Sequence, residues 1–199
     1  MINMDALVEH IRHLSPVILD TDDKFLFIGT RKVCLSSVYD CLGARNINRK
    51  DRKKLWEYKI SATDIYKIFK FTIARNPWDR MVSSFHHLQQ HLHRINQKVK
   101  FKDFVKTTFR KKGVSRDSHF EYQYPKFYFD GKIFVDFIGR LERIQEDWKY
   151  IASKIDCDPM LPHENKSRHN PYQEYYDKEC IEIIGDIYHK DIELLGYKF

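Results

Sequence analysis

Cysteine is scarce in this chain of 199 residues, and its spacing carries no metal-binding or redox signature. The four cysteines form no CxxC pair and no Cys/His cluster with the spacing of metal ligands; they are Cys34, Cys41, Cys157 and Cys180. Four cysteines in a chain of this length are also too few for a disulfide framework. We therefore expect reduced, mostly structural thiols and no metal site.

Long apolar runs are absent as well. No segment approaches the roughly 20 apolar residues that a membrane-spanning helix requires. The amino-terminal segment mixes charged and apolar side chains, unlike a signal peptide, and carries Asp5, Glu9, His10, Arg12 and His13. No internal repeat, linker or low-complexity tract interrupts the chain. These absences predict a cytoplasmic protein with one domain over 1–199, of which 1–23 form an N-terminal helical extension.

Aromatic residues and positive charge are plentiful instead. Fourteen Phe, twelve Tyr and three Trp, within a chain that is 42% hydrophobic, predict an aromatic-rich core and exclude disorder. The formal charge of +7 indicates an anionic partner. A nucleotide, a sulfated or phosphorylated glycan, nucleic acid and an acidic membrane all fit, and charge alone does not choose among them.

The segment 69–85 reads as a buried strand that runs into a helix. Asn76 supplies an N-cap, Pro77 suits the first helical position, and Asp79 completes a pattern that resembles a capping box. An apolar stripe predicts that the helix continues to about 94–97; its members are Trp78, Met81, Val82, Phe85, Leu88 and Leu92. Arg75 then lies at the carboxyl end of a strand beside helix amides, which is an anion site. Ser83 is two turns into the helix and can add a hydroxyl.

A second strand, 24–28, leads into the basic loop 29–34 and a helix that opens with Ser36 and Ser37. A strand, a short basic loop and hydroxyl residues at a helix start are typical of a phosphate cradle. The loop is not a Walker A sequence, because no second glycine precedes Lys32.

These two segments resemble those of sulfotransferases that use 3′-phosphoadenosine 5′-phosphosulfate (PAPS), in particular the group with the chondroitin and heparan O-sulfotransferases and bacterial relatives. Residues 75–83 resemble the RNPxDRxxS segment, and the loop resembles PKTxxTS, although Arg31 replaces its Pro. Leu35 stands where small residues are usual, so it must point into the core to leave room for a phosphate. Further similar blocks are HxxxQ at 119–123, VDFIGRxE at 135–142, LPHxNKS at 161–167 and DxELFGY at 191–197.

The resemblance implies an α/β fold: a central parallel sheet flanked by helices, with a P-loop-like donor loop. It implies transfer of a sulfuryl group from PAPS to an acceptor hydroxyl, without a metal. The acceptor is expected to be a carbohydrate, as in membrane-associated polysaccharide biosynthesis, or another small molecule. The donor-binding residues it indicates are Arg31, Lys32, Ser36, Ser37, Arg75, Ser83, Arg140, Lys166 and Ser167. Two alternatives stay open: Arg140 can instead pair with Glu142, and the loop 161–168 can be a surface connection.

The resemblance implies a catalytic role for Lys32, which would neutralise charge on the departing phosphate oxygen. The base that accepts the acceptor's proton is either His119, from the HxxxQ block, or Glu57, which the resemblance does not assign directly. Glu57 and Lys59 stand where the family often carries a His, and a carboxylate can accept a hydroxyl proton, but such a Glu is more often a solvated helix residue. The helical histidines around 86–93 lack a third ligand, which favours surface polar residues over a zinc site.

The remaining segments predict helices at 5–14, 51–66, 101–109 and 145–155, a strand within 133–142, and a final helix from 172. Two rival functions are a non-catalytic nucleic-acid-binding module and a small-molecule kinase on a related fold. The first is disfavoured because no RNP, KH or helix-turn-helix signature is present, and the second because the Walker loop is missing.

Overall fold

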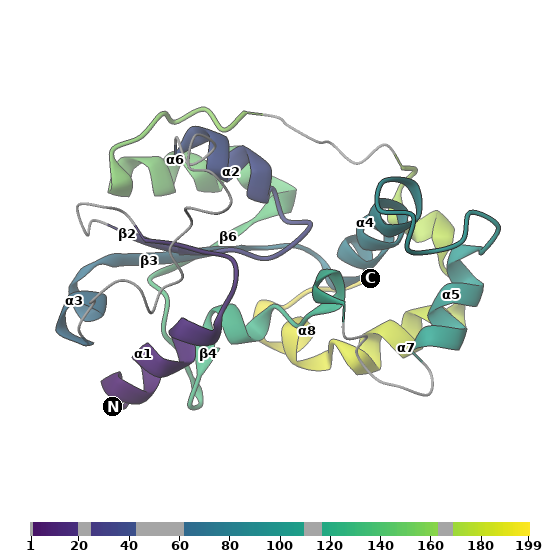
Figure 1. The fold of residues 1–199 in the computed structure, drawn as a ribbon, viewed down its shortest axis with the longest axis horizontal. Helices are drawn as coiled ribbons and strands as arrows, with labels where there is room; N and C mark the ends of the chain where they lie inside the picture. Colours follow the sequence, from purple (N-terminus) through teal and green to yellow (C-terminus); the bar gives the residue numbers. More distant parts are fainter. Residues whose placement is uncertain (1, 20–24, 43–61, 110–116, 163–168) are drawn as a thin grey trace. The chain divides into compact units, whose positions relative to one another are not determined.

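A computed structural model describes residues 2–19, 25–42, 62–109, 117–162 and 169–199 (Figure 1). The chain packs as two units: the first comprises Met1–Ala74 and Pro125–Asn165, and the second Arg75–Tyr124 and Lys166–Phe199. The prediction of one domain over 1–199 stays a prediction. No helix within the described ranges is both long and apolar enough to cross a membrane.

A four-stranded sheet forms the centre of the first unit. Its strands are β1 (Val17–Leu19), β2 (Phe25–Ile28), β3 (Phe69–Ala74) and β6 (Phe137–Arg140), in the order β1-β2-β3-β6. The strands β2, β3 and β6 are parallel, so their carboxyl ends share one edge, where Ala74 is in register with Arg140. This confirms the predicted central parallel sheet, to which β1 adds an antiparallel edge strand that we did not predict.

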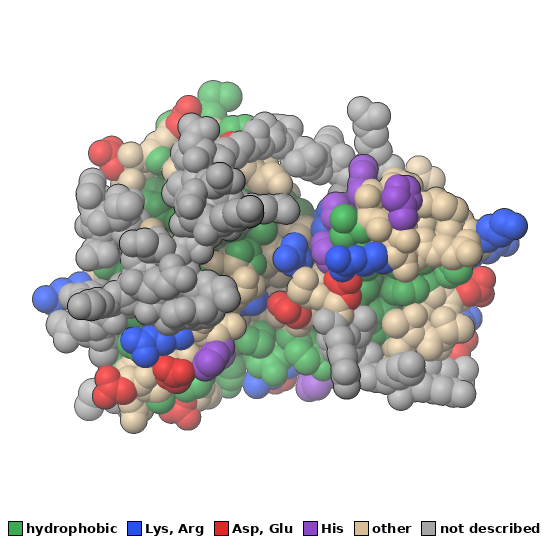
Figure 2. Space-filling view, in the orientation of Figure 1, with side chains coloured by type: hydrophobic (Ala, Val, Ile, Leu, Met, Phe, Trp, Pro, Cys, Tyr) green, Lys and Arg blue, Asp and Glu red, His purple; other side chains and the backbone are tan. Residues whose placement is uncertain are grey.

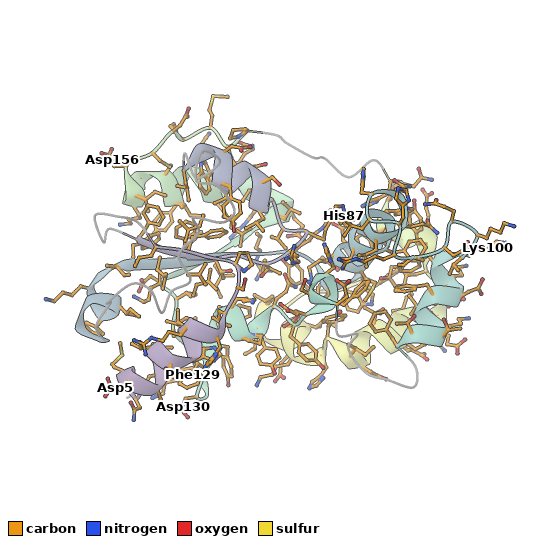
Figure 3. All side chains as sticks on the ribbon, viewed as in Figure 1. Asp5, His87, Lys100, Phe129, Asp130 and Asp156 are labelled. Carbon is orange, nitrogen blue, oxygen red and sulfur yellow. The ribbon has the colours of Figure 1, made fainter. Side chains whose placement is uncertain are left out.

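Helices cover both faces of this sheet (Figure 1). On one face lie α2 (Leu35–Cys41) and α6 (Ile144–Ile155); on the other lie α1 (Met4–His13) and α3 (Ala62–Lys67). Successive side chains of β2 point to opposite faces of the sheet. Phe25 and Phe27 pack with Trp148 of α6 on one face, whereas Leu26 and Ile28 are buried on the other. Side chains fill the space between the sheet and α6 (Figure 3). A hairpin of β4 (Tyr128–Phe129) and β5 (Lys132–Ile133) completes the unit.

The second unit is helical. It contains α4 (Pro77–Gln90), α5 (Phe101–Thr108), α7 (Lys178–Ile187) and α8 (His189–Leu195), with short 3₁₀ turns η2 (Ser118–Phe120) and η5 (Tyr172–Tyr175). Two further turns, η3 (Tyr124–Lys126) and η4 (Leu141–Arg143), lie elsewhere in the chain. The core joins α4, α5 and α7 through aromatic side chains, and the Tyr176 hydroxyl donates to the Trp78 carbonyl at 2.9 Å.

The predicted helix from Pro77 is shorter than expected. It ends at Gln90, and Leu92, which we placed on the buried stripe, is 40% exposed. The N–H of Arg94 donates to the carbonyl of Leu88 at 2.8 Å, and the buried amide of Gln89 donates to the Asn96 and Val99 carbonyls. These contacts turn the chain out of the helical path before Leu92 reaches the core.

Two other elements are divided. The strand expected within 133–142 is interrupted over 134–136, between β5 and β6. The backbone N–H of Asp136 donates to the Lys70 carbonyl, and its carboxylate accepts from the Lys70 N–H and ammonium. The single final helix is instead η5, α7 and α8. The predicted helix 51–66 is described only from Ala62, and Glu57 lies outside the described residues.

Candidate functional site

The loop 29–34 leaves β2 at the carboxyl edge of the parallel strands and enters α2. Two of its non-glycine residues have left-handed backbone conformations: Lys32 with φ 65° and Cys34, the N-cap of α2, with φ 39°. The Thr30 hydroxyl is buried and has no hydrogen-bond partner among the residues that the structure describes. The loop thus combines two left-handed residues with a buried hydroxyl.

Close packing at Gly29 settles the position of Leu35. A Cβ at Gly29 would lie 2.7 Å from Leu35 Cδ1 and 3.0 Å from Pro16 Cγ, so a larger side chain does not fit without a shift. Leu35 folds back onto the loop and packs against the core around Phe27 and Trp148. Leu35 therefore points into the core, the orientation that it needs if the loop is to leave room for a phosphate.

The polar side chains of this loop differ in exposure. Arg31 and Ser36 are exposed, Lys32 is half-buried, and Ser37 is buried. Arg140 ends β6 at the same edge of the sheet, and its backbone N–H donates to Asp147 Oδ2 at 2.7 Å. The first unit therefore brings these five predicted donor-binding residues to one edge of the sheet.

In the second unit, Arg75 and the start of α4 form a rigid turn. Asn76 Oδ1 accepts from the backbone N–H of Trp78 at 3.0 Å and of Asp79 at 3.5 Å, which confirms the predicted cap. Arg75 is only 6% exposed, and its Nε donates to Asp79 Oδ2 at 2.8 Å. A largely buried guanidinium is thus held beside the amino terminus of a 14-residue helix.

The backbone of Arg75 is held from a distant part of the chain. The Arg75 N–H donates to Gln123 Oε1 at 3.0 Å, and Gln123 Nε2 donates back to the Arg75 carbonyl at 2.8 Å. Asp191 of α8 in turn accepts from the backbone N–H groups of Gln123 and Tyr124. Burial raises the pKa of Asp191, while the nearby charge of Arg80 opposes that shift.

His119 lies beside α4, largely buried. Its Nδ1 and the Oδ1 of Asp117 are 2.6 Å apart, and its backbone carbonyl accepts from Arg80 and from the Ser84 hydroxyl. Burial alone would raise the pKa of Asp117, but hydrogen bonds from His119 and Arg94 lower it below its usual range. An imidazole whose Nδ1 faces a carboxylate has the orientation of a general base.

Histidines gather around α4 and the segments against it (Figure 2). The rings of His86 and His169 stack with centroids 5.7 Å apart, and the ring of His87, labelled in Figure 3, lies 5.2 Å from that of His119. Burial lowers the pKa of His86, with a smaller contribution from the charge of His169. Across the described ranges, no group of three His, Cys, Asp or Glu side chains is placed to hold a metal.

The second unit thus places three predicted residues along or beside α4: Arg75, Ser83, which is buried, and His119. Glu57, Lys166 and Ser167 lie outside the described residues. Gln123, Asp117 and Asp191 have no role predicted from the sequence. The only signal for Gln123 and Asp191 was their place in the HxxxQ and DxELFGY blocks.

A comparison with protein-family models finds one that matches most of the chain. The model is described as the sulfotransferase family and covers residues 16–198. No curated protein matches the chain.

Proposed function

The chain belongs to the sulfotransferase family, and we propose that it moves a sulfuryl group from PAPS to a hydroxyl of a carbohydrate acceptor. Family membership supports sulfuryl transfer in general. The observation that carries the choice of PAPS is the buried guanidinium of Arg75, fixed by Asp79 at the start of α4. A guanidinium beside helix amides is suited to a phosphate that is not itself transferred, as the 3′-phosphate of PAPS would be.

In this proposal the second unit binds the 3′-phosphate. Arg75 supplies the charge, the first turn of α4 supplies amides, and Ser83 supplies a hydroxyl. The Asn76 cap supports this role, because it holds that turn in place before a ligand arrives.

The loop 29–34 and the first turn of α2, both in the first unit, bind the 5′ end of the donor in a P-loop-like manner. Lys32, Arg31, Ser36 and Ser37 are their binding groups, and Arg140 contributes from the end of β6. The buried, unpartnered hydroxyl of Thr30 within the described part supports a loop shaped for a polar ligand. Lys166 and Ser167, which lie outside the described residues, keep their predicted role in donor binding.

The residues of this chain contribute positioning and charge, as in other transfers of anionic groups. PAPS supplies the sulfuryl group. Lys32 stabilises negative charge at the bridging phosphate oxygen. His119 is our preferred base for the acceptor hydroxyl: with a proton on Nδ1 facing Asp117, its Nε2 carries the lone pair that a base needs. Glu57 is the alternative base.

The resemblance alone supports the choice of acceptor, because the formal charge of +7 favours anionic partners in general and does not choose among them. We propose a carbohydrate hydroxyl on a surface polysaccharide, a glycolipid or a small glycan intermediate. A cytoplasmic location stays a prediction from the sequence.

Calorimetric titration separates this function from its rivals. We expect adenosine 3′,5′-bisphosphate to bind more tightly than adenosine 5′-phosphate, and we expect ATP and a single-stranded oligonucleotide to bind weakly. Tighter binding of ATP would favour a kinase, and tighter binding of the oligonucleotide would favour a nucleic-acid module. A screen of acceptor glycans with ³⁵S-labelled PAPS then tests transfer and identifies the acceptor class.

A further inference from the structure

A single side chain holds both peptide groups that flank the Cα of Arg75. Gln123 is 1% exposed, accepts from the Arg75 N–H at 3.0 Å and donates to the Arg75 carbonyl at 2.8 Å. A primary amide with this pair of bonds replaces the strand neighbour that a residue beyond the end of a sheet lacks. The backbone of Arg75 is therefore fixed without a strand partner.

Gln123 is itself held by a buried charge. Asp191 is fully buried on α8, and its carboxylate accepts from the Gln123 N–H at 2.9 Å and from the Tyr124 N–H at 2.7 Å. Arg80, 2% exposed, lies near enough for its charge to act on Asp191. Charge-assisted hydrogen bonds of this kind are stronger than neutral ones and allow little movement.

The remaining freedom of Arg75 is in its side chain, and Asp79 restricts that at Nε. Backbone and side chain are thus restrained by different residues, Gln123 and Asp79. A cation that is preorganised in this way loses less conformational entropy when an anion binds.

We propose that Gln123 is a positioning residue for donor binding, which acts only through Arg75. Gln123 aims the guanidinium at the 3′-phosphate by fixing the Arg75 backbone, and Asp191 keeps Gln123 in place. The inference rests on the proposed function, in which Arg75 binds that phosphate.

The test compares two buried glutamines of the same unit. Gln123→Met keeps the length of the side chain but removes both hydrogen bonds to Arg75. Gln89→Met is the matched control, because Gln89 is 8% exposed and donates to the Asn96 and Val99 carbonyls, away from Arg75. We expect both variants to melt at lower temperature than the wild type.

Only Gln123→Met should alter nucleotide binding. We expect its Kd for adenosine 3′,5′-bisphosphate, measured by calorimetry, to rise about 10- to 100-fold, the range that misplacement of a binding group produces. Binding of adenosine 5′-phosphate, which lacks the 3′-phosphate, should change little. In the background of Arg75→Ala, Gln123→Met should have no further effect on Kd.

Each other outcome is decisive. An unchanged Kd in Gln123→Met, an equal loss in Gln89→Met, or an undiminished effect in the Arg75→Ala background would overturn the positioning role and leave the proposed function intact. If the wild type does not prefer the 3′-phosphate, the proposed function itself fails, and this inference fails with it. Should Gln123→Met not fold, Asp191→Asn replaces it, because the negative charge is lost and an amide NH₂ takes the place of Oδ2, which accepts from the Gln123 N–H at 2.9 Å.

Discussion

The loop 29–34 and the turn 75–79 both follow parallel strands, yet they are held in place by different forces. Local apolar packing and backbone conformation shape the loop, through Leu35 against Gly29 and the left-handed Lys32. Distant polar side chains shape the turn: Gln123 lies 48 residues from Arg75, and Asp191 lies 68 residues from Gln123. Apolar packing and backbone conformation dominate in the loop, and long-range polar contacts dominate in the turn.

This difference has a functional consequence. A loop shaped by its backbone presents N–H groups whose direction does not depend on any one side chain. A turn held by a polar network presents one preset guanidinium, which is sensitive to every member of the network. Substitutions in the loop and in the turn should therefore impair donor binding and turnover to different extents.

The largest expected effects distinguish the role of Arg75 from that of Lys32. Arg75→Ala should weaken adenosine 3′,5′-bisphosphate about 100-fold, as expected for loss of a charged hydrogen bond, and should abolish its preference over adenosine 5′-phosphate. Lys32→Ala should keep that preference but reduce turnover about 100- to 1,000-fold, like the removal of a preorganised charge-stabilising group. Calorimetry and transfer of ³⁵S check the pair.

Lys100→Ala is the control for loss of positive charge, because Lys100 is exposed in the second unit (Figure 3). It should match the wild type in both assays. Unchanged affinity for the bisphosphate in Arg75→Ala would contradict the assignment of the 3′-phosphate to this residue.

A second prediction concerns the base. His119→Ala should lower turnover more than it lowers donor affinity, because Arg80 and Ser84 bind its backbone carbonyl, which the substitution retains. Asp117→Asn should lower turnover less and alter its pH profile, since the carboxylate beside Nδ1 is lost. Steady-state kinetics at saturating donor measure both effects. An unchanged turnover number in His119→Ala would show that another residue is the base, and Glu57 would be the next candidate to test.

A third prediction probes the packing of the loop. Gly29→Ala should lower the free energy of unfolding by about 1–3 kcal/mol, the usual cost of overpacking, because its Cβ meets Leu35 and Pro16. Leu35 is the flexible neighbour and should be displaced, so the Gly29→Ala variant should bind the donor more weakly than the wild type. Urea unfolding with calorimetry checks this result. Gly131→Ala is a control without crowding, since nothing lies within 4 Å of its Cβ position, although its φ of 76° adds backbone strain.

The smallest effect is expected from pH. The N–H of Cys180, followed by the ammonium of Lys106, lowers the pKa of the half-buried Asp177 to about 2. The native state therefore releases this proton more readily than the unfolded state, so the contribution of Asp177 is present above its ordinary pKa and is lost as pH falls through about 2. Urea unfolding between pH 5 and pH 2.5 should show a shallower decline in Asp177→Asn than in the wild type. An equal decline of stability with falling pH in both proteins would show that this ion pair does not contribute to acid sensitivity.

Local sequence signals predicted the elements around both sites. The cap at Asn76 and the start of α4 at Pro77 depend on residues within one helical turn, and the apolar runs of β2 and β3 predicted strands directly. The end of α4 was missed because Gln89 bonds to carbonyls seven and ten residues farther along the chain. Periodicity carries no signal for such a contact.

The same limit applies to the candidate site. The spacing from Arg75 to Ser83 is visible in the sequence, and so is the basic loop around Lys32. The sequence also contained Gln123 and Asp191 in similar blocks, but it did not say what either residue binds. Their partners became clear only once distant segments were placed together in the second unit.

The sequence alone determined the strands β2 and β3, the start of α4 with Arg75 beside it, and the resemblance to a sulfotransferase, because each depends on residues close together in the chain. Only the tertiary structure decided that Leu35 turns into the core and that Gln123 and Asp191 hold the backbone of Arg75. The reason is physical: burial and buried polar contacts are formed between distant segments, and a residue pattern along the chain does not encode which of them will meet.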